Sequence, residues 1–180
     1  MKPIILAFAG GIASGKSTLS LNVANTLGWK HLGFGNYIRD IAFQKGITPS
    51  RENLQQLGER LINELGWEKF CINFLKNGKW YNKIPLIIDG VRHIEILDAL
   101  TKITSPYEVL LVFISLNYNE RLSRLKERDN WKKNNLKKYD SHSTEIQINS
   151  KLKEIADICV DGHKSIKNLT KEIISWLNQV

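Results

Sequence analysis

Hydrophobic residues gather into five short runs that predict β-strands. Four of these runs are continuous or nearly so, which is typical of strands that are buried on both faces of a parallel sheet. The predicted strands cover residues 4–9, 30–34, 86–89, 109–115 and 158–160.

Between these runs, apolar residues recur at every third or fourth position, which predicts amphipathic helices. Thr48 and Pro49 predict the start of one helix, because threonine suits the N-cap and proline suits the first helical position. The predicted helices cover residues 17–27, 37–44, 49–65, 67–76, 93–101, 119–129, 144–155 and 165–178.

The alternation of strands and helices predicts an α/β fold of three layers, with a five-stranded parallel sheet flanked by helices and right-handed crossovers. We expect one domain over residues 1–180. Two segments interrupt the alternation: a helical block over about residues 36–80 and a polar stretch, rich in lysine and asparagine, over residues 130–143. With the end of the preceding helix, the polar stretch makes up a segment over about residues 121–143. Both are predicted to be mobile covers, an acceptor-binding insertion and a short lid, rather than further domains.

Composition narrows the class of protein. The chain of 180 residues is 42% hydrophobic and 24% charged, as in soluble globular proteins, and its net charge is +8. A basic excess suits an anionic partner, which leaves nucleotide, nucleic acid and a membrane surface open. The two cysteines have no metal-site spacing, and no apolar run reaches the length of a membrane span. These features favour a reducing compartment, and we expect a cytoplasmic protein without membrane attachment.

One glycine-rich motif carries the strongest chemical signal. Residues 10–18 match the phosphate-binding pattern GxxxxGK[ST], and they lie between a predicted strand and a predicted helix. The glycines let backbone N–H groups surround a phosphate, and the helix N-terminus adds positive potential. We expect Lys16 to contact the β- and γ-phosphates of ATP and Ser17 to ligate Mg²⁺. The predicted ATP-binding residues in the loop are Gly10, Gly11, Ala13, Ser14, Gly15, Lys16, Ser17 and Thr18.

Such a loop also occurs in GTPases, motors and ATP-driven machines. GTPases read guanine with an N-K-x-D element, whereas the only Asn-Lys pair here is Asn82-Lys83, followed by Ile84-Pro85. Large ATPases need a longer chain than this one. The sequence therefore favours a small kinase that uses Mg-ATP.

Arginines follow several predicted strands. Arg39 comes after the second strand within Gly35-Asn36-Tyr37-Ile38-Arg39, and Arg92 follows the third within Asp89-Gly90-Val91-Arg92. Loops after parallel strands meet at one edge of the sheet, so both arginines are expected near the phosphate loop. Arginine grips phosphate oxygens at two points. Three further arginines, at spacings of three and four, lie on the helix expected after the fourth strand: Arg121, Arg124 and Arg128.

The order of these motifs resembles the nucleoside monophosphate kinase superfamily, nearest the branch of dephospho-CoA kinases and archaeal nucleotide-kinase-like proteins. The resemblance extends almost from end to end. It implies that Arg39 and Arg92 hold the phosphate of an acceptor. It also implies that the lid arginines close over the transferring group, with Arg121 on ATP and Arg124 and Arg128 catalytic. By the same resemblance, Asp89 orients Mg²⁺ through water or polarises the acceptor, and Gly162 lies in a turn against the donor adenine.

Asn36 departs from the pattern of dephospho-CoA kinases, which carry an aspartate here that is thought to act as a base toward a sugar hydroxyl. An amide does not accept a proton in that way, whereas an anionic phosphate acceptor needs no base. Asn36 therefore favours transfer to a ribo- or deoxyribonucleoside monophosphate, although Asp89 remains an alternative base.

Three alternatives remain open. Dephospho-CoA or another small metabolite is a rival acceptor, and a nucleotide-binding or RNA-associated ATPase is a rival of another class. The lysine-rich segment near Trp131 also suits nucleic acid, but a charged lid over a triphosphate explains the same residues, so nucleic acid is disfavoured. Monomer and homodimer are both compatible with the sequence.

Overall fold

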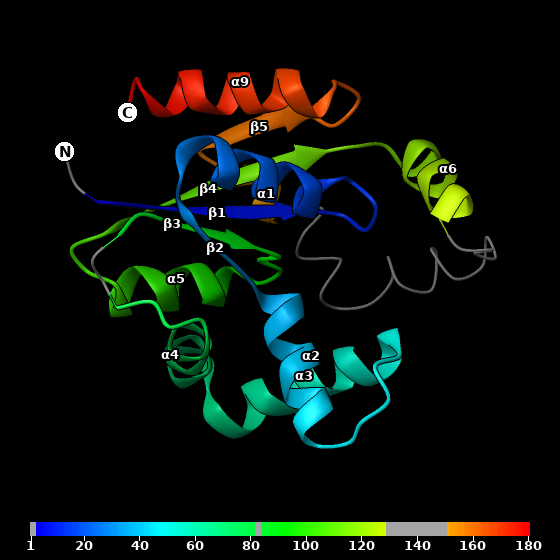
Figure 1. The fold of residues 1–180 in the computed structure, drawn as a ribbon, viewed down its shortest axis with the longest axis vertical. Coiled ribbons are helices and arrows are strands. Elements are labelled where there is room, and N and C mark those ends of the chain that lie inside the picture. Colours follow the sequence, from blue (N-terminus) through cyan, green and yellow to red (C-terminus); the bar gives the residue numbers. More distant parts are fainter. Residues whose placement is uncertain (1–2, 82–83, 129–150) are drawn as a thin grey trace.

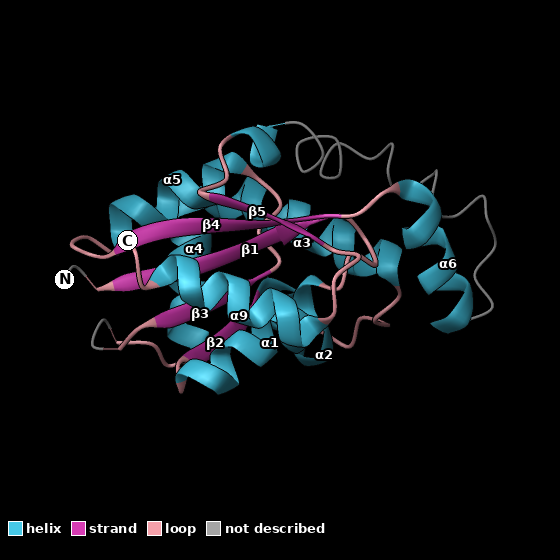
Figure 2. Cartoon of the chain, turned by 90° about the horizontal axis from the view of Figure 1, so that it is seen from above, coloured by secondary structure: helices cyan, strands magenta, loops and turns pink. Residues whose placement is uncertain are grey.

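The computed structural model describes residues 3–81, 84–128 and 151–180. Five parallel strands form one sheet in the order β2-β3-β1-β4-β5. Figures 1 and 2 show all five pointing the same way, with their carboxyl ends toward α6 (Tyr118–Arg128). The strands are β1 (Ile4–Gly10), β2 (Lys30–Gly33), β3 (Leu86–Asp89), β4 (Glu108–Ser115) and β5 (Ile158–Asp161).

Helices cover both faces of the sheet, because alternate residues of its strands point to opposite sides. On β1, Leu6 and Phe8 belong to one core cluster, whereas Ile5 and Ala7 belong to the other. The helices α1 (Lys16–Leu27) and α9 (Ile166–Leu177) pack on the face that contains Leu6 and Phe8. Four helices belong to the core on the face that contains Ile5 and Ala7: α2 (Phe34–Gln44), α3 (Arg51–Leu65), α4 (Trp67–Asn77) and α5 (Ile94–Ile103). The predicted three-layer fold with a five-stranded parallel sheet is confirmed.

Two predicted helix starts are wrong. The helix expected at residue 37 begins at Phe34, which is buried and stacks on Phe74 with ring centroids 4.0 Å apart, so packing rather than a capping side chain places this end. The helix expected to start at Pro49 begins instead at Arg51. Its N-cap is Ser50, whose hydroxyl accepts a hydrogen bond from the Asn53 N–H at 3.2 Å, the bond that a serine cap is suited to make.

The helix predicted over residues 144–155 lies mostly outside the described residues, of which 151–154 are helical. Of the predicted lid over residues 121–143, the structure describes the part within α6. In the described ranges, no helix is long and apolar enough to cross a membrane.

The strand order places the phosphate-loop motif at the centre of the sheet. β1 lies between β3 and β4, and the chain leaves it first toward the β3–β2 side and later toward the β4–β5 side. A crevice forms at the carboxyl ends of strands where the order reverses in this way. The loop after β1 therefore meets the residues that follow β2, β3 and β4.

Candidate functional site

The loop between β1 and α1 has the backbone that a phosphate cradle requires. Gly10 has φ +150°, and a Cβ there would lie 2.9 Å from the Ile114 carbonyl oxygen, so a side chain would collide with β4. Gly15 has φ +90° and forms the N-cap of α1, where it offers no side chain to bond the first N–H groups. The first turn of α1 also contains no acidic residue. Its free N–H groups and positive end therefore favour an anion.

Cations concentrate next to this cradle. Burial, and then the nearby guanidinium of Arg92, lower the pKa of Lys16 from its ordinary 10.5 to about 7, even though Asp89 acts in the opposite direction. Burial, and then the charge of Arg51, lower the pKa of Arg92 to about 10. The surroundings of Lys16 and Arg92 therefore disfavour the positively charged form of each side chain. A bound polyanion would stabilise both positive charges, so the electrostatics of the site favour phosphate.

Asp89 supplies the carboxylate of this region at the end of β3. Within the described part of the chain, its buried Oδ1 has no hydrogen-bond partner. Ser17 lines the same cavity, at the start of α1. The described residues contain no cluster of three or more His, Cys, Asp or Glu side chains that could hold a metal. The pair nevertheless fits Mg²⁺, which is commonly held by one or two protein oxygens, phosphate oxygens and water.

His31 on β2 lines the cavity and belongs to none of the predicted motifs. Its Nε2 lies 2.9 Å from the hydroxyl of Ser20, which also bonds the Ser17 carbonyl oxygen at 3.1 Å. Burial lowers the pKa of His31, so the neutral imidazole is favoured near pH 7. Sequence alone offered no signal for His31, because its approach to Ser20 depends on how β2 packs against α1.

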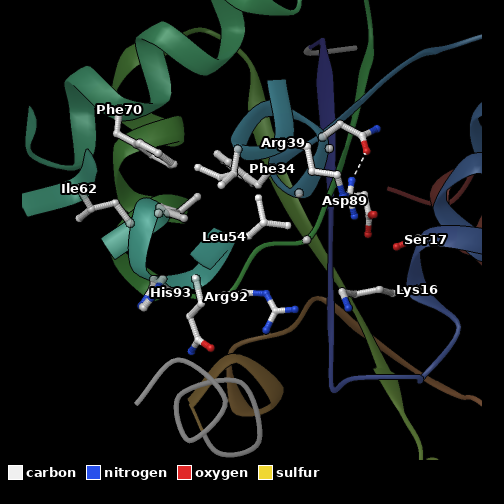
Figure 3. Close-up of a pocket in the computed structure, with 18 of the residues that line it drawn as sticks. Lys16, Ser17, Phe34, Arg39, Leu54, Ile62, Phe70, Asp89, Arg92 and His93 are labelled. Carbon is white, nitrogen blue, oxygen red and sulfur yellow. Dashed lines mark hydrogen bonds between the residues drawn. The ribbon is translucent and has the colours of Figure 1, made fainter. Parts of the chain in front are cut away.

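A cavity of about 540 Å³ opens from the phosphate loop toward the helices after β2. Figure 3 shows Lys16, Ser17 and Asp89 at one end, apolar side chains such as Phe70 and Ile62 at the other, and Arg92 between the two ends. The predicted acceptor residues Asn36, Arg39 and Arg92 all line this cavity, together with Lys16, Ser17 and Asp89.

Two of the predicted acceptor residues contact each other. Arg39 donates from Nη1 to Asn36 Oδ1 at 2.5 Å, and its guanidinium lies beside Gly35. The side chains of Asn36 and Asp89 both approach Gly33, at 3.7 Å and 3.8 Å from the position of a Cβ there. The ends of β2 and β3 therefore place both residues beside Gly33.

The helix α3 contributes three polar residues that also lie outside the predicted motifs: Arg51, Gln55 and Glu59 line the cavity. A signal for them exists in the sequence. Their spacing of four residues places them on one face of a helix, but only the tertiary structure shows that this face points into the cavity.

The arginines on α6 contact the backbone of the phosphate loop. Arg121 is buried, and its Nη1 lies 3.5 Å from the Ile12 carbonyl oxygen. A Cβ on Gly11 would lie 2.8 Å from the same Nη1, so a side chain there would displace the guanidinium of Arg121. Arg124 donates to the carbonyl oxygens of Ser14, at 3.2 Å, and of Gly162, at 2.8 Å. The side chain of Arg128 and the rest of the predicted lid lie outside the described residues.

A second cavity, of about 400 Å³, lies on the other side of the phosphate loop. It is lined by Gly11, by the end of β4, by Asp161 at the end of β5, and by His163 after it. His163 Nδ1 lies 2.6 Å from Asp161 Oδ1, and its Nε2 lies 3.2 Å from Asn117 Nδ2. Gly162 is buried beside this cavity, where a Cβ would lie 3.0 Å from the Ser115 carbonyl oxygen. Of the predicted loop residues, Thr18 is exposed on α1, and Ala13 takes a positive φ of 61°.

The chain has the α/β fold of P-loop kinases, with a phosphate loop at the carboxyl end of its central strand. The chain belongs to the family described as "AAA domain", whose sequence profile matches residues 6–148.

Three known proteins illustrate the likeness. A "UPF0200 protein" of Aeropyrum pernix is 28% identical over 128 residues, which are 69% of this chain and 65% of that protein. This chain therefore matches less than two thirds of that relative's length. The cytidylate kinase of Natronomonas pharaonis is 36% identical over 50 residues, 28% of this chain and 26% of that protein. The structure of shikimate kinase from Acinetobacter baumannii in complex with shikimate has a TM-score of 0.64 at 17% identity, over 99% of this chain and 94% of that chain.

Proposed function

We propose that this protein transfers the γ-phosphoryl group of ATP to a nucleoside monophosphate. The observation that carries this proposal is a single cavity with a graded lining. Its cationic end adjoins the phosphate loop, and its other end is apolar and aromatic. An acceptor with a phosphate at one end and a flat base at the other matches both ends.

Each end has a defined task. Lys16 and the N-terminus of α1 neutralise the phosphates of the donor, and Arg92 and Arg39 hold the phosphate of the acceptor in line. A magnesium ion held by Ser17, and through water by Asp89, would supply further neutralisation of the donor phosphates. The second cavity, beside Gly162, takes the donor base. The acceptor phosphate is already anionic, so the reaction needs no proton acceptor at Asn36.

The likeness to cytidylate kinase supports the same class of acceptor, since that enzyme is named for a nucleoside monophosphate. Shikimate kinase shares the fold at low identity, and its acceptor carries no phosphate. The cluster of Arg39, Arg51 and Arg92 along the cavity favours a phosphate-bearing acceptor over shikimate.

The test is ADP release from Mg-ATP with each ribo- and deoxyribonucleoside monophosphate in turn. Dephospho-CoA, shikimate and an RNA oligomer complete the panel. Strong stimulation by a monophosphate that is lost in Lys16→Met supports the proposal. Stimulation by dephospho-CoA or shikimate alone would assign a different small-molecule kinase, and a response to RNA alone would make the protein an RNA-associated ATPase.

A further inference from the structure

The helix α3 presents two parallel stripes of residues to the acceptor cavity. One stripe is polar and the other is apolar, and within each stripe the residues are four apart, so they follow one face of the helix. The polar stripe is Arg51, Gln55 and Glu59, and the apolar stripe is Leu54, Gly58 and Ile62; all six residues line the cavity.

The polar stripe has a direction. Arg51 lies at its phosphate end, because its charge contributes to the lowered pKa values of Lys16 and Arg92. Glu59 lies eight residues further along α3, which corresponds to about 12 Å along a helix axis. Figure 3 shows the same direction in the apolar stripe, where Leu54 lies closer to Lys16 than Ile62 does. The distance from Arg51 to Glu59 is of the size that separates the phosphate of a nucleoside monophosphate from the outer edge of its base.

Gly58 indicates where a ring would lie. A glycine inside a helix costs about 1 kcal/mol relative to alanine. Packing within the described protein does not require that glycine, since a Cβ there would have only ordinary contacts, 3.8 Å and 4.0 Å from two carbons of Ile38. A missing side chain on a cavity wall permits close approach of a ligand to the backbone. Gly58 therefore leaves room for a ring on the cavity wall beside the polar stripe.

We propose that Glu59, assisted by Gln55, selects an acceptor whose base carries an exocyclic amino group: cytosine, adenine or guanine. Uracil and thymine are rejected. This inference rests on the proposed function and names the substrate class of the same site.

The hydrogen-bond donors and acceptors on the edges of the bases explain this selection. An ionised glutamate only accepts hydrogen bonds, so it pairs with the amino group of cytosine or adenine, or with the two adjacent N–H donors of guanine. Uracil and thymine present a carbonyl oxygen where cytosine has its amino group, and two facing acceptors repel each other. Gln55 carries both a donor and an acceptor, so its amide can serve the ring nitrogen or carbonyl beside the amino group. Glu59 is thus a determinant of specificity, whereas Arg51 and Arg92 recognise the phosphate that all monophosphates share.

The experiment compares kcat/KM for CMP and UMP, a pair that differs at the position of the amino group. AMP, GMP and dTMP extend the comparison. A lost or mismatched pair of this kind is worth about 1–3 kcal/mol, so we expect the amino-bearing acceptors to be preferred by roughly tenfold to a hundredfold. Glu59→Gln supplies an amide N–H that bonds a carbonyl oxygen, so it should reduce the CMP/UMP ratio by at least tenfold. Glu64→Gln, exposed on the same helix, is the control and should leave the ratio unchanged.

The possible outcomes distinguish a failure of this inference from a failure of the proposed function. If UMP or dTMP is as good a substrate as the amino-bearing monophosphates in the unmodified protein, the inference is wrong and the kinase assignment stands. If Glu59→Gln keeps its circular dichroism spectrum and the original CMP/UMP ratio, Glu59 does not read the base. If no monophosphate stimulates ADP release, both proposals fail.

Discussion

Lys16 is predicted to destabilise the nucleotide-free protein, and replacing it with methionine should therefore raise the free energy of unfolding. The cause is the surroundings described above: burial and three arginines disfavour the ammonium, and Asp89 offsets them only in part. Methionine keeps the length of the side chain and removes its charge. On the proposed function, ATP should stabilise the unmodified protein. The same substitution should abolish that stabilisation, because the cradle loses its lysine.

The size of the effect follows from the pKa of Lys16. A fall from 10.5 to about 7, at about 1.4 kcal/mol for each pKa unit, corresponds to about 5 kcal/mol as an upper bound. The side chain is only partly buried, and screening by water reduces this to roughly 2–3 kcal/mol. The folded protein binds fewer protons at Lys16 than the unfolded chain between pH 7 and pH 10.5, so the penalty is complete below pH 7 and disappears as the pH rises to 10.5. The gain from Lys16→Met should follow the same course.

Urea unfolding followed by tryptophan fluorescence at pH 6, 8 and 10 measures this dependence. Lys102→Met is the matched control, because it also removes one charge from a protein of net charge +8, but at an exposed ion pair with Glu68. That pair is expected to be worth no more than about 1 kcal/mol. A Lys16→Met protein that is less stable than the unmodified one at pH 6, or a gain that is the same at all three pH values, would refute the reasoning.

Three further predictions concern the same site. Gly58→Ala should raise the free energy of unfolding by about 0.5–1 kcal/mol and raise the KM of the monophosphate several-fold, because the new Cβ occupies the ligand's space; a stabilised variant with an unchanged KM would show that the base lies elsewhere. Arg39→Ala should raise the acceptor KM by roughly tenfold through a lost charge-assisted bond, while Arg60→Ala, exposed on α3, should not; equal effects of the two would remove Arg39 from the site. ATP binding at pH 8 should take up close to one proton, since the bound polyanion restores the charge of Lys16, and calorimetry in two buffers of different ionisation enthalpy would detect it; a binding heat that does not depend on the buffer would contradict this.

The sequence by itself determined those features that depend on neighbouring residues. Continuous or nearly continuous apolar runs predicted four of the five parallel strands, because a strand buried on both faces has no polar alternation. The phosphate loop was also recognisable, since Gly10, Gly15 and Lys16 act through a short stretch of backbone with fixed spacing. Helix starts were predicted less well. Phe34 begins α2 through packing against Phe74, and Ser50, not Thr48, is positioned to bond the first turn of α3.

Tertiary structure alone decided which distant residues share the site. Arg92 was expected near Lys16 because both follow parallel strands, but only the packing of α3 beneath the sheet brings the charge of Arg51 to them. Packing also decided that Arg121 lies buried against the backbone of the phosphate loop. The physical reason is that helical periodicity shows which residues share one face of a helix. Which other elements that face packs against depends on how all the helices pack on the sheet. The spacing of the polar stripe on α3 could therefore be read from the sequence, but its place in the lining of the acceptor cavity could not.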